Sequence, residues 1–141
     1  MNEIVPRYEF RAFAQTFGLA AEKIRRLAPC DAITESAERY LLSRQDRRHN
    51  VKVRGGQLDI KQLIEDTGRL ERWKPVAKQS FPISRDFIAS SLWPAWGLAD
   101  AALERDAYPL DALVNEVVRA TPLLCSACVF KRRFRFTVSS C

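Results

Sequence analysis

The sequence predicts an α+β fold in which an antiparallel β-sheet is accompanied by about three helices. Several segments alternate apolar and polar residues, as strands with one buried face do, and two of them flank Gly55-Gly56, a dipeptide that favours a two-residue hairpin turn. Other segments repeat apolar residues at three- and four-residue spacing, which is typical of helices. The chain has 141 residues, and we expect residues 1–141 to form one domain around one core.

The N-terminal part of the sequence predicts a strand followed by a helix. Residues 5–13 alternate regularly, which gives the strand an apolar face and a charged face. The charged face would carry Arg7, Glu9 and Arg11. From about Thr16 to Leu27 the apolar spacing becomes helical, and Pro29 then ends the helix.

The hairpin at residues 50–61 follows a predicted strand at residues 38–43 and a polar loop. A turn at Gly55-Gly56 would set Val53 opposite Leu58 and Lys52 opposite Asp59. One face of the hairpin would then be wholly apolar. The other face would carry Asn50, Lys52, Arg54, Asp59 and Lys61.

The second half of the chain alternates turns, helices and one basic strand. The expected elements are a turn at Thr67-Gly68, a short strand at residues 70–73, a helix capped by Ser84 and ended by Pro94 with Gly97, a helix over residues 109–119, and a strand over residues 129–138. In the last strand, Lys131, Arg133 and Arg135 would share one face.

The charge balance predicts an anionic partner. Lys and Arg number 23 against 17 Asp and Glu, which gives a net charge of +6. Charge alone leaves open a nucleic acid, a nucleotide or a polyphosphate. No apolar run approaches the roughly 18 residues of a membrane span, and the first residues lack the pattern of a signal peptide. We therefore expect a soluble, cytoplasmic protein that does not enter a membrane.

The four cysteines are Cys30, Cys125, Cys128 and Cys141. Cys125 and Cys128 are spaced as half of a zinc-ribbon signature, but a structural zinc site usually needs a second pair or histidines. The one histidine, His49, is distant in sequence. We expect small, partly buried cysteines in a reducing compartment, ahead of a zinc site or a thioredoxin-like redox role.

Three segments share one design, an apolar face backed by a face with evenly spaced cations. These cations are Arg7 and Arg11, then Lys52, Arg54 and Lys61, then Lys131, Arg133 and Arg135. On one antiparallel sheet such faces come together, and the repulsion between like charges favours a bound anion. Arg and Lys are the donors that phosphate oxygens need. The alternative is a set of solvated faces, with cations that protect edge strands from aggregation.

The order of these segments resembles the CYTH superfamily of triphosphate tunnel metalloenzymes. The likeness covers about residues 5–138 and is carried by the hairpin motif N-x-K-x-R-x-x-x-L-D-I-K, which starts at Asn50, and by the later strand K-R-R-F-R-F. The resemblance implies that the antiparallel sheet is curved into a partial tunnel-like barrel with the helices packed outside. It also implies a basic lumen that binds a triphosphate-containing anion, and a metal-dependent phosphohydrolase activity.

The resemblance also implies roles for particular residues. It makes six cations candidate substrate ligands, namely Arg11, Lys52, Arg54, Lys61, Arg133 and Arg135, and it makes Glu9 and Asp59 candidate ligands for Mg²⁺ or Mn²⁺. The first strand departs from the Glu-x-Glu-x-Lys signature of the family, because Arg7 stands where the first acid belongs. That replacement should weaken metal binding, so whether the protein is an enzyme stays open.

The chain stops shortly after the last predicted strand, whereas members of the superfamily usually continue through further strands. A shortened member, a truncated product, and a sheet that closes against a second subunit as a homodimer through its open edge are all consistent with this. Two other functions stay open: a non-catalytic basic module that binds nucleic-acid backbone, and an interaction protein whose charges are solvated.

Overall fold

Six strands form one antiparallel sheet that curls through 234° into a half-barrel, in a computed structural model that describes residues 6–139. The strand order across the sheet is β1-β5-β4-β3-β2-β8. The strands are β1 (Arg7–Glu9), β2 (Cys30–Ser43), β3 (His49–Arg54), β4 (Gln57–Asp66), β5 (Glu71–Ser80) and β8 (Leu124–Phe136). The α+β fold with a curved antiparallel sheet is therefore confirmed. Residue 5, the side chain of Arg7, and Cys141 lie outside the described part of the chain.

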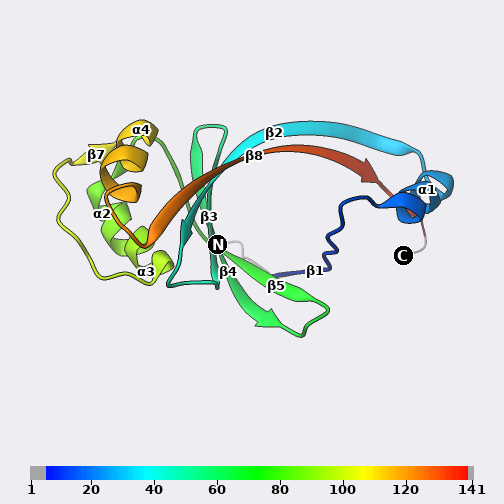
Figure 1. Ribbon diagram of the computed structural model, residues 1–141, viewed down its shortest axis with the longest axis horizontal. Coiled ribbons are helices and arrows are strands. Elements are labelled where there is room, and N and C mark those ends of the chain that lie inside the picture. Colours follow the sequence, from blue (N-terminus) through cyan, green and yellow to red (C-terminus); the bar gives the residue numbers. More distant parts are fainter. Residues whose placement is uncertain (1–5, 140–141) are drawn as a thin grey trace, which may run out of the picture.

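Three helices accompany the sheet (Figure 1). The first, α1 (Gly18–Leu27), sits at the far end of the long ribbon formed by β2 and β8. The second begins with α2 (Arg85–Phe87), continues through π-helical turns over Ile88–Leu92, and ends with α3 (Trp93–Trp96). The third begins with α4 (Leu110–Ala112) and continues through π-helical turns over Leu113–Val118. A two-stranded sheet of β6 (Ile83–Ser84) and β7 (Ala107–Tyr108) leads into these last two helices.

The core lies between the outer face of the hairpin and the last two helices. Val51, Val53, Leu58 and Ile60 of β3 and β4 are at most 5% exposed, and they belong to one cluster with buried residues of the helices. The helical residues of this cluster include Leu92, Trp93, Trp96, Leu113 and Val117. Trp96 Nε1 also donates a hydrogen bond of 3.2 Å to the carbonyl oxygen of Leu41 on β2, so the sheet and the helices are joined by packing and by a buried polar contact.

The end of the second helix differs from the prediction. Ser84 caps its start as expected, since its Oγ accepts a hydrogen bond of 3.1 Å from the backbone N–H of Phe87. Pro94, however, does not end it. Pro94 is the second residue of α3 and directly follows the π-helical turns, and the helix continues to Trp96 and ends before Gly97, whose φ of 65° suits glycine.

The lengths of several strands also differ from the prediction. The first strand is confined to Arg7–Glu9, whereas β2, β5 and β8 are all longer than predicted. β2 and β8 pair with each other over almost their whole length. The hydrogen bonds of this pairing keep the polar parts of both strands extended, although these parts would not form strands alone. β5 even contains Pro75, which is tolerated because it lies beside an irregularity in the pairing with β4.

The expectation of partly buried cysteines is wrong for the described residues. Cys30, Cys125 and Cys128 are free and exposed. All three lie on the β2–β8 ribbon, and much of this ribbon extends beyond the helical layer, so that it is covered on neither face (Figure 1). Within residues 6–139, no helix is both long enough and apolar enough to cross a membrane.

Candidate anion-binding site

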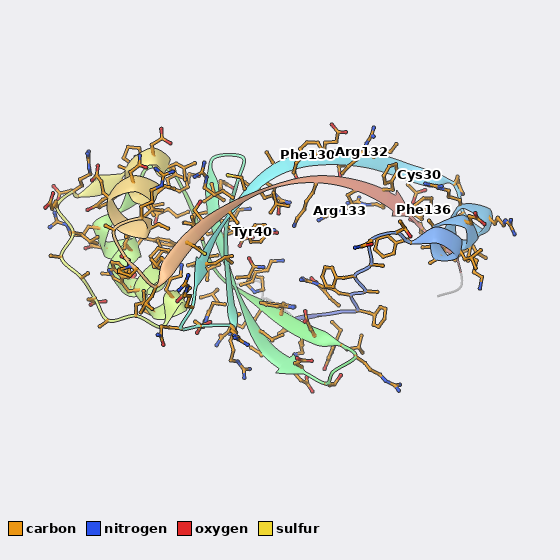
Figure 2. The ribbon with its side chains drawn as sticks, in the orientation of Figure 1. Cys30, Tyr40, Phe130, Arg132, Arg133 and Phe136 are labelled. Carbon is orange, nitrogen blue, oxygen red and sulfur yellow. The ribbon has the colours of Figure 1, made fainter. Side chains whose placement is uncertain are left out.

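The two faces of the hairpin have opposite environments. The structure confirms the predicted register, including Val53 opposite Leu58 and Lys52 opposite Asp59. Because the apolar face packs on the helices, the polar face lines the concave side of the half-barrel (Figures 1 and 2). Alternation along the strands therefore places Lys52, Arg54, Asp59 and Lys61 on the concave side.

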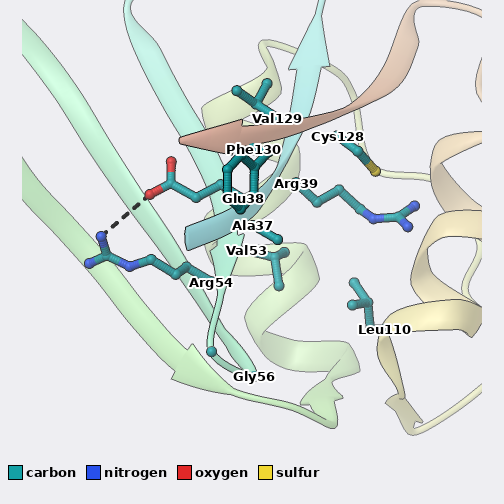
Figure 3. Close-up of a pocket in the computed structure, with 11 residues that line it drawn as sticks. Ala37, Glu38, Arg39, Val53, Arg54, Gly56, Leu110, Cys128, Val129 and Phe130 are labelled. Carbon is teal, nitrogen blue, oxygen red and sulfur yellow. Dashed lines mark hydrogen bonds and ion pairs between the residues drawn. The ribbon is translucent and has the colours of Figure 1, made fainter. Parts of the chain in front are cut away.

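A buried carboxylate, that of Glu38 on β2, lies at the centre of the cations on the concave side. Glu38 is 2% exposed. One carboxylate oxygen, Oε2, is 2.8 Å from Lys131 Nζ on β8 and accepts a 2.8 Å hydrogen bond from the Tyr40 hydroxyl. The other oxygen, Oε1, is 3.4 Å from Arg54 Nη1 (Figure 3). It is also 3.9 Å from Lys52 Nζ, and Arg54 and Lys52 both lie on β3. Glu38 thus links three strands through charge.

The sheet order explains why these groups meet. β2 lies between β3 and β8, and Tyr40 is directly opposite Lys52 in the β2–β3 register. Residues 38 and 40 share one face of β2, and Lys131 shares that face on the neighbouring strand, where it also donates a hydrogen bond to Tyr40. Cations from two segments far apart in sequence therefore share one acceptor.

The cations around Glu38 control its protonation. Burial alone would raise the pKa of Glu38, but the hydrogen bonds from Lys131 and Tyr40 and the charge of Lys52 outweigh burial and lower this pKa to about 2. Burial lowers the pKa of Lys52, even though the charge of Glu38 opposes this effect. For Lys131, burial is outweighed by the hydrogen bonds with Glu38 and Tyr40, and the pKa is raised. At neutral pH, Glu38 is a carboxylate among cations.

A small polar cavity of about 60 Å³ adjoins this cluster. It is lined by Lys52, Arg54, Gln57, Asp59 and Lys78. Three of these residues occupy opposing positions on neighbouring strands, namely Lys52 on β3, Asp59 on β4 and Lys78 on β5. At the cavity, the carboxylate of Asp59 therefore has one lysine on the strand to each side. The volume is enough for a few water molecules or a small anionic group.

Another charged group lies where β1 pairs with β5. Arg11 Nη2 is 2.6 Å from Glu9 Oε2, and Arg11 Nε is 3.8 Å from Glu71 Oε2. The guanidinium of Arg11 also lies 5.7 Å from the ring centre of Trp73. The hydrogen bond from Arg11 outweighs burial and lowers the pKa of Glu9, with smaller contributions from Lys61 and Lys52. Arg11, a predicted substrate ligand, is therefore already held by two carboxylates.

The two predicted metal ligands lie on β1 and β4, which are separated in the sheet by β5. Glu9 is opposite Glu71 on β5, whereas Asp59 is opposite Lys78, which is seven residues further along that strand. Mg²⁺ takes oxygen ligands and is usually held through one or two carboxylates, with water and phosphate oxygens as its other ligands. Within residues 6–139, no three carboxylate, cysteine or histidine side chains come together as a metal site. The described residues therefore form no metal site with three such donors, and binding of Mg²⁺ or Mn²⁺ stays a prediction.

The predicted cations on β8 extend away from the Glu38 cluster. Arg133 points to the concave side and Arg132 to the opposite side of the ribbon (Figure 2). Arg133 and Arg135 are opposite Thr34 and Ala32 of β2, and in the described part of the chain neither forms an ion pair. Both are exposed and available to a ligand.

Sequence reasoning missed Glu38, Tyr40 and Lys78. Glu38 and Tyr40 begin the predicted strand at residues 38–43, and their two-residue spacing places both on one face, which was the available signal. Lys78 lies beyond the predicted end of β5 and had no such signal. Comparisons with protein-family models, with curated proteins and with solved structures give no match for this chain.

Proposed function

We propose that the concave face of the half-barrel binds a triphosphate-containing anion, such as tripolyphosphate or a nucleoside triphosphate. The observation that carries this proposal is the meeting of cations from β3, β4, β5 and β8 on one concave surface. The six cations are Lys52, Arg54, Lys61, Lys78, Lys131 and Arg133. These six cations and the carboxylates of Glu38 and Asp59 have together a net charge of +4.

The distribution of these cations over the concave surface favours binding of a polyphosphate over binding of a single phosphate. Lys61, Lys78 and Arg133 lie on three different strands, and none of them forms an ion pair with another described residue. Their charges are distributed along the surface, so a ligand with several linked phosphates can contact more of them than one phosphate can. Membership of the CYTH superfamily, which the hairpin from Asn50 to Lys61 suggests, is part of the same proposal.

Glu38 has a defined role in this proposal. Its carboxylate holds Lys52, Arg54 and Lys131 close together before any ligand binds, which lowers their mutual repulsion and the entropy lost on binding. The side chain of Arg54 is 50% exposed, and its one contact with Glu38 is a long 3.4 Å, so most of its donors are available to phosphate oxygens.

The proposal covers binding and assigns no hydrolytic step to these residues. Cations that grip a bound triphosphate would also favour the charge that spreads over its oxygens during phosphoryl transfer. Metal-dependent hydrolysis and Mg²⁺ or Mn²⁺ binding stay predictions, because within residues 6–139 no three carboxylate, cysteine or histidine side chains come together as a metal site. A cytoplasmic location also stays a prediction.

Isothermal titration calorimetry with tripolyphosphate tests the proposal. We expect Arg54→Ala to weaken binding by about tenfold or more, since a hydrogen bond to a charged group contributes roughly 1.5–3 kcal/mol. Arg119→Ala is the matched control, because Arg119 donates to Asn115 on an outer helix, and it should leave the affinity unchanged.

Equal affinity of the Arg54→Ala variant and the unaltered protein would remove Arg54 from the site. A single-stranded oligonucleotide, titrated over a range of salt concentrations, separates the other candidate. If it binds more tightly than tripolyphosphate and with a steeper salt dependence, the face binds nucleic-acid backbone instead. Titrations with and without Mg²⁺, with assay of released phosphate, test the metal and the activity.

A further inference from the structure

The last strand, β8 (Leu124–Phe136), has one edge without a strand partner in the described chain. β8 is the end strand of the sheet, and within residues 6–139 only β2 pairs with it. It runs for 13 residues along the arch of the ribbon (Figure 1). The backbone N–H and C=O groups on its outer edge can therefore accept an added strand.

The side chains of β8 determine which strand would fit. On the concave side, Arg133 and Arg135 are exposed and, in the described chain, unpaired with any carboxylate, whereas Lys131 is held by Glu38. A neighbouring strand places its own side chains beside these cations on the same face, where acidic residues are attracted and basic residues are repelled. The concave side of the added strand should therefore be acidic.

The opposite side of β8 carries Phe130 and Phe134 with Arg132 between them, and Arg132 is paired with Glu35 at 3.1 Å and lies 5.7 Å from the ring centre of Phe134. Phe130 and Phe134 are 68% and 46% exposed, and Phe130 lies on the outer side of the ribbon (Figure 2). Near the end of the strand, Phe134 and Phe136 join Phe17, Ala20 and Ile24 in an apolar groove of about 220 Å³ beside α1. Apolar side chains of an added strand would extend this surface and remove it from water.

Two simpler explanations of the edge are weaker. Cations on an edge strand can serve only to prevent aggregation, but that role does not explain exposed phenylalanines on the other side of the same strand. A second copy of the chain could pair β8 with β8, but that arrangement brings its own cations side by side. Charge therefore favours a partner of a different sequence.

We propose that the open edge of β8 binds an extended segment of a partner protein in which acidic and apolar residues alternate. The segment adds a seventh strand to the six-stranded sheet. Its acidic side chains lie beside Arg133 and Arg135, and its apolar side chains lie beside Phe130 and Phe134. This interaction surface shares Arg133 with the proposed anion site, whereas Phe130, Phe134 and Arg135 are not among the residues proposed for that site.

A fluorescent eight-residue peptide that alternates Glu and Val is a direct probe, with binding to the full chain followed by fluorescence anisotropy. Three control peptides are a peptide with the same residues in two blocks, a peptide that alternates Lys and Val, and the Glu-Val peptide with alternate backbone nitrogens methylated. We expect each control to bind at least about tenfold more weakly, because each removes the alternation, the charge match or the backbone hydrogen bonds.

Protein variants separate this surface from the anion site. Arg135→Glu, at a cation outside the six proposed for the anion site, should lose roughly tenfold in affinity for the Glu-Val peptide and gain affinity for the Lys-Val peptide. Phe134→Ala, on the outer side, should weaken peptide binding and leave tripolyphosphate binding unchanged. A protein that does not bind tripolyphosphate can thus still bind the peptide, and a protein that does not bind the peptide can still bind tripolyphosphate. The two proposals can therefore fail separately.

Equal binding of the methylated and unmethylated peptides would overturn the proposal, because strand addition needs the backbone. Analytical ultracentrifugation of the protein alone should show a monomer. If a dimer forms and the Glu-Val peptide does not dissociate it, the dimer interface lies elsewhere on the chain and the proposal stands. If the peptide dissociates the dimer, the edge of β8 binds a second copy of the chain and the proposal is overturned.

Discussion

Replacement of Glu38 by Gln tests the central feature of the concave face. The side chain keeps its size and loses its charge, so Lys52, Arg54 and Lys131 are left close together without their shared carboxylate. The ordinary pKa of a Glu side chain is 4.5, and that of Glu38 is about 2. This difference corresponds to about 3 kcal/mol of folding free energy at neutral pH. Removing one partner of a buried ion pair typically costs about 3–5 kcal/mol, which agrees with this magnitude.

The effect should depend on pH in a defined direction. Because folding lowers the pKa of Glu38, its contribution to stability is fully present above the unfolded pKa of 4.5 and is lost as the pH falls from there through about 2. The unaltered protein should therefore lose this contribution on acidification, whereas the Glu38→Gln variant has none to lose. The difference in stability between the two proteins should shrink across this pH range.

Urea unfolding, followed by the fluorescence of the buried Trp93 and Trp96, measures both effects. We expect Glu38→Gln to lower the free energy of unfolding by about 3 kcal/mol at pH 7, and by progressively less as the pH falls below 4.5. Glu116→Gln is a matched control, because Glu116 forms an exposed ion pair with Arg105 and should contribute far less. A loss in Glu38→Gln that is the same at pH 7 and pH 3 would refute the electrostatic reasoning.

Two further substitutions test the cavity and the core. Asp59→Asn removes a negative charge from the cavity between Lys52 and Lys78, so calorimetry at low salt should show tighter tripolyphosphate binding, and weaker binding would contradict the proposed location of the ligand. Leu58→Ala empties a fully buried position between the hairpin and the helices, and urea unfolding should show a loss of about 2–5 kcal/mol; a loss below about 1 kcal/mol would contradict the core.

Local sequence patterns predicted the elements whose signals are contained within a few residues. The hairpin turn at Gly55-Gly56 and the register of β3 with β4 follow from glycine at the two turn positions and from alternation on both sides. The cap at Ser84 follows in the same way from one hydroxyl at a helix start. The full length of β2 and β8 could not be predicted, because mutual pairing, rather than the alternation of either strand, keeps them extended.

The candidate site shows the same division. Alternation in the sequence was sufficient to place Lys52 and Arg54 on one face of the hairpin and to identify β8 as basic. It did not reveal that Arg11 is engaged by Glu9 and Glu71, because β5 supplies one of these carboxylates from a distant part of the chain. It also named Glu9 and Asp59 as metal ligands, and the structure shows that their strand partners on β5, Glu71 and Lys78, are seven residues apart.

The sequence by itself determined which residues alternate, where the chain turns and where positive charge accumulates, since these properties depend on neighbours along the backbone. Only the tertiary structure decided that Glu38 is buried among three cations, because its partners come from strands on both sides of β2. The curl of the sheet decided that these groups share one concave surface. Lateral strand order and curvature arise from packing between distant segments, and no local pattern carries that information.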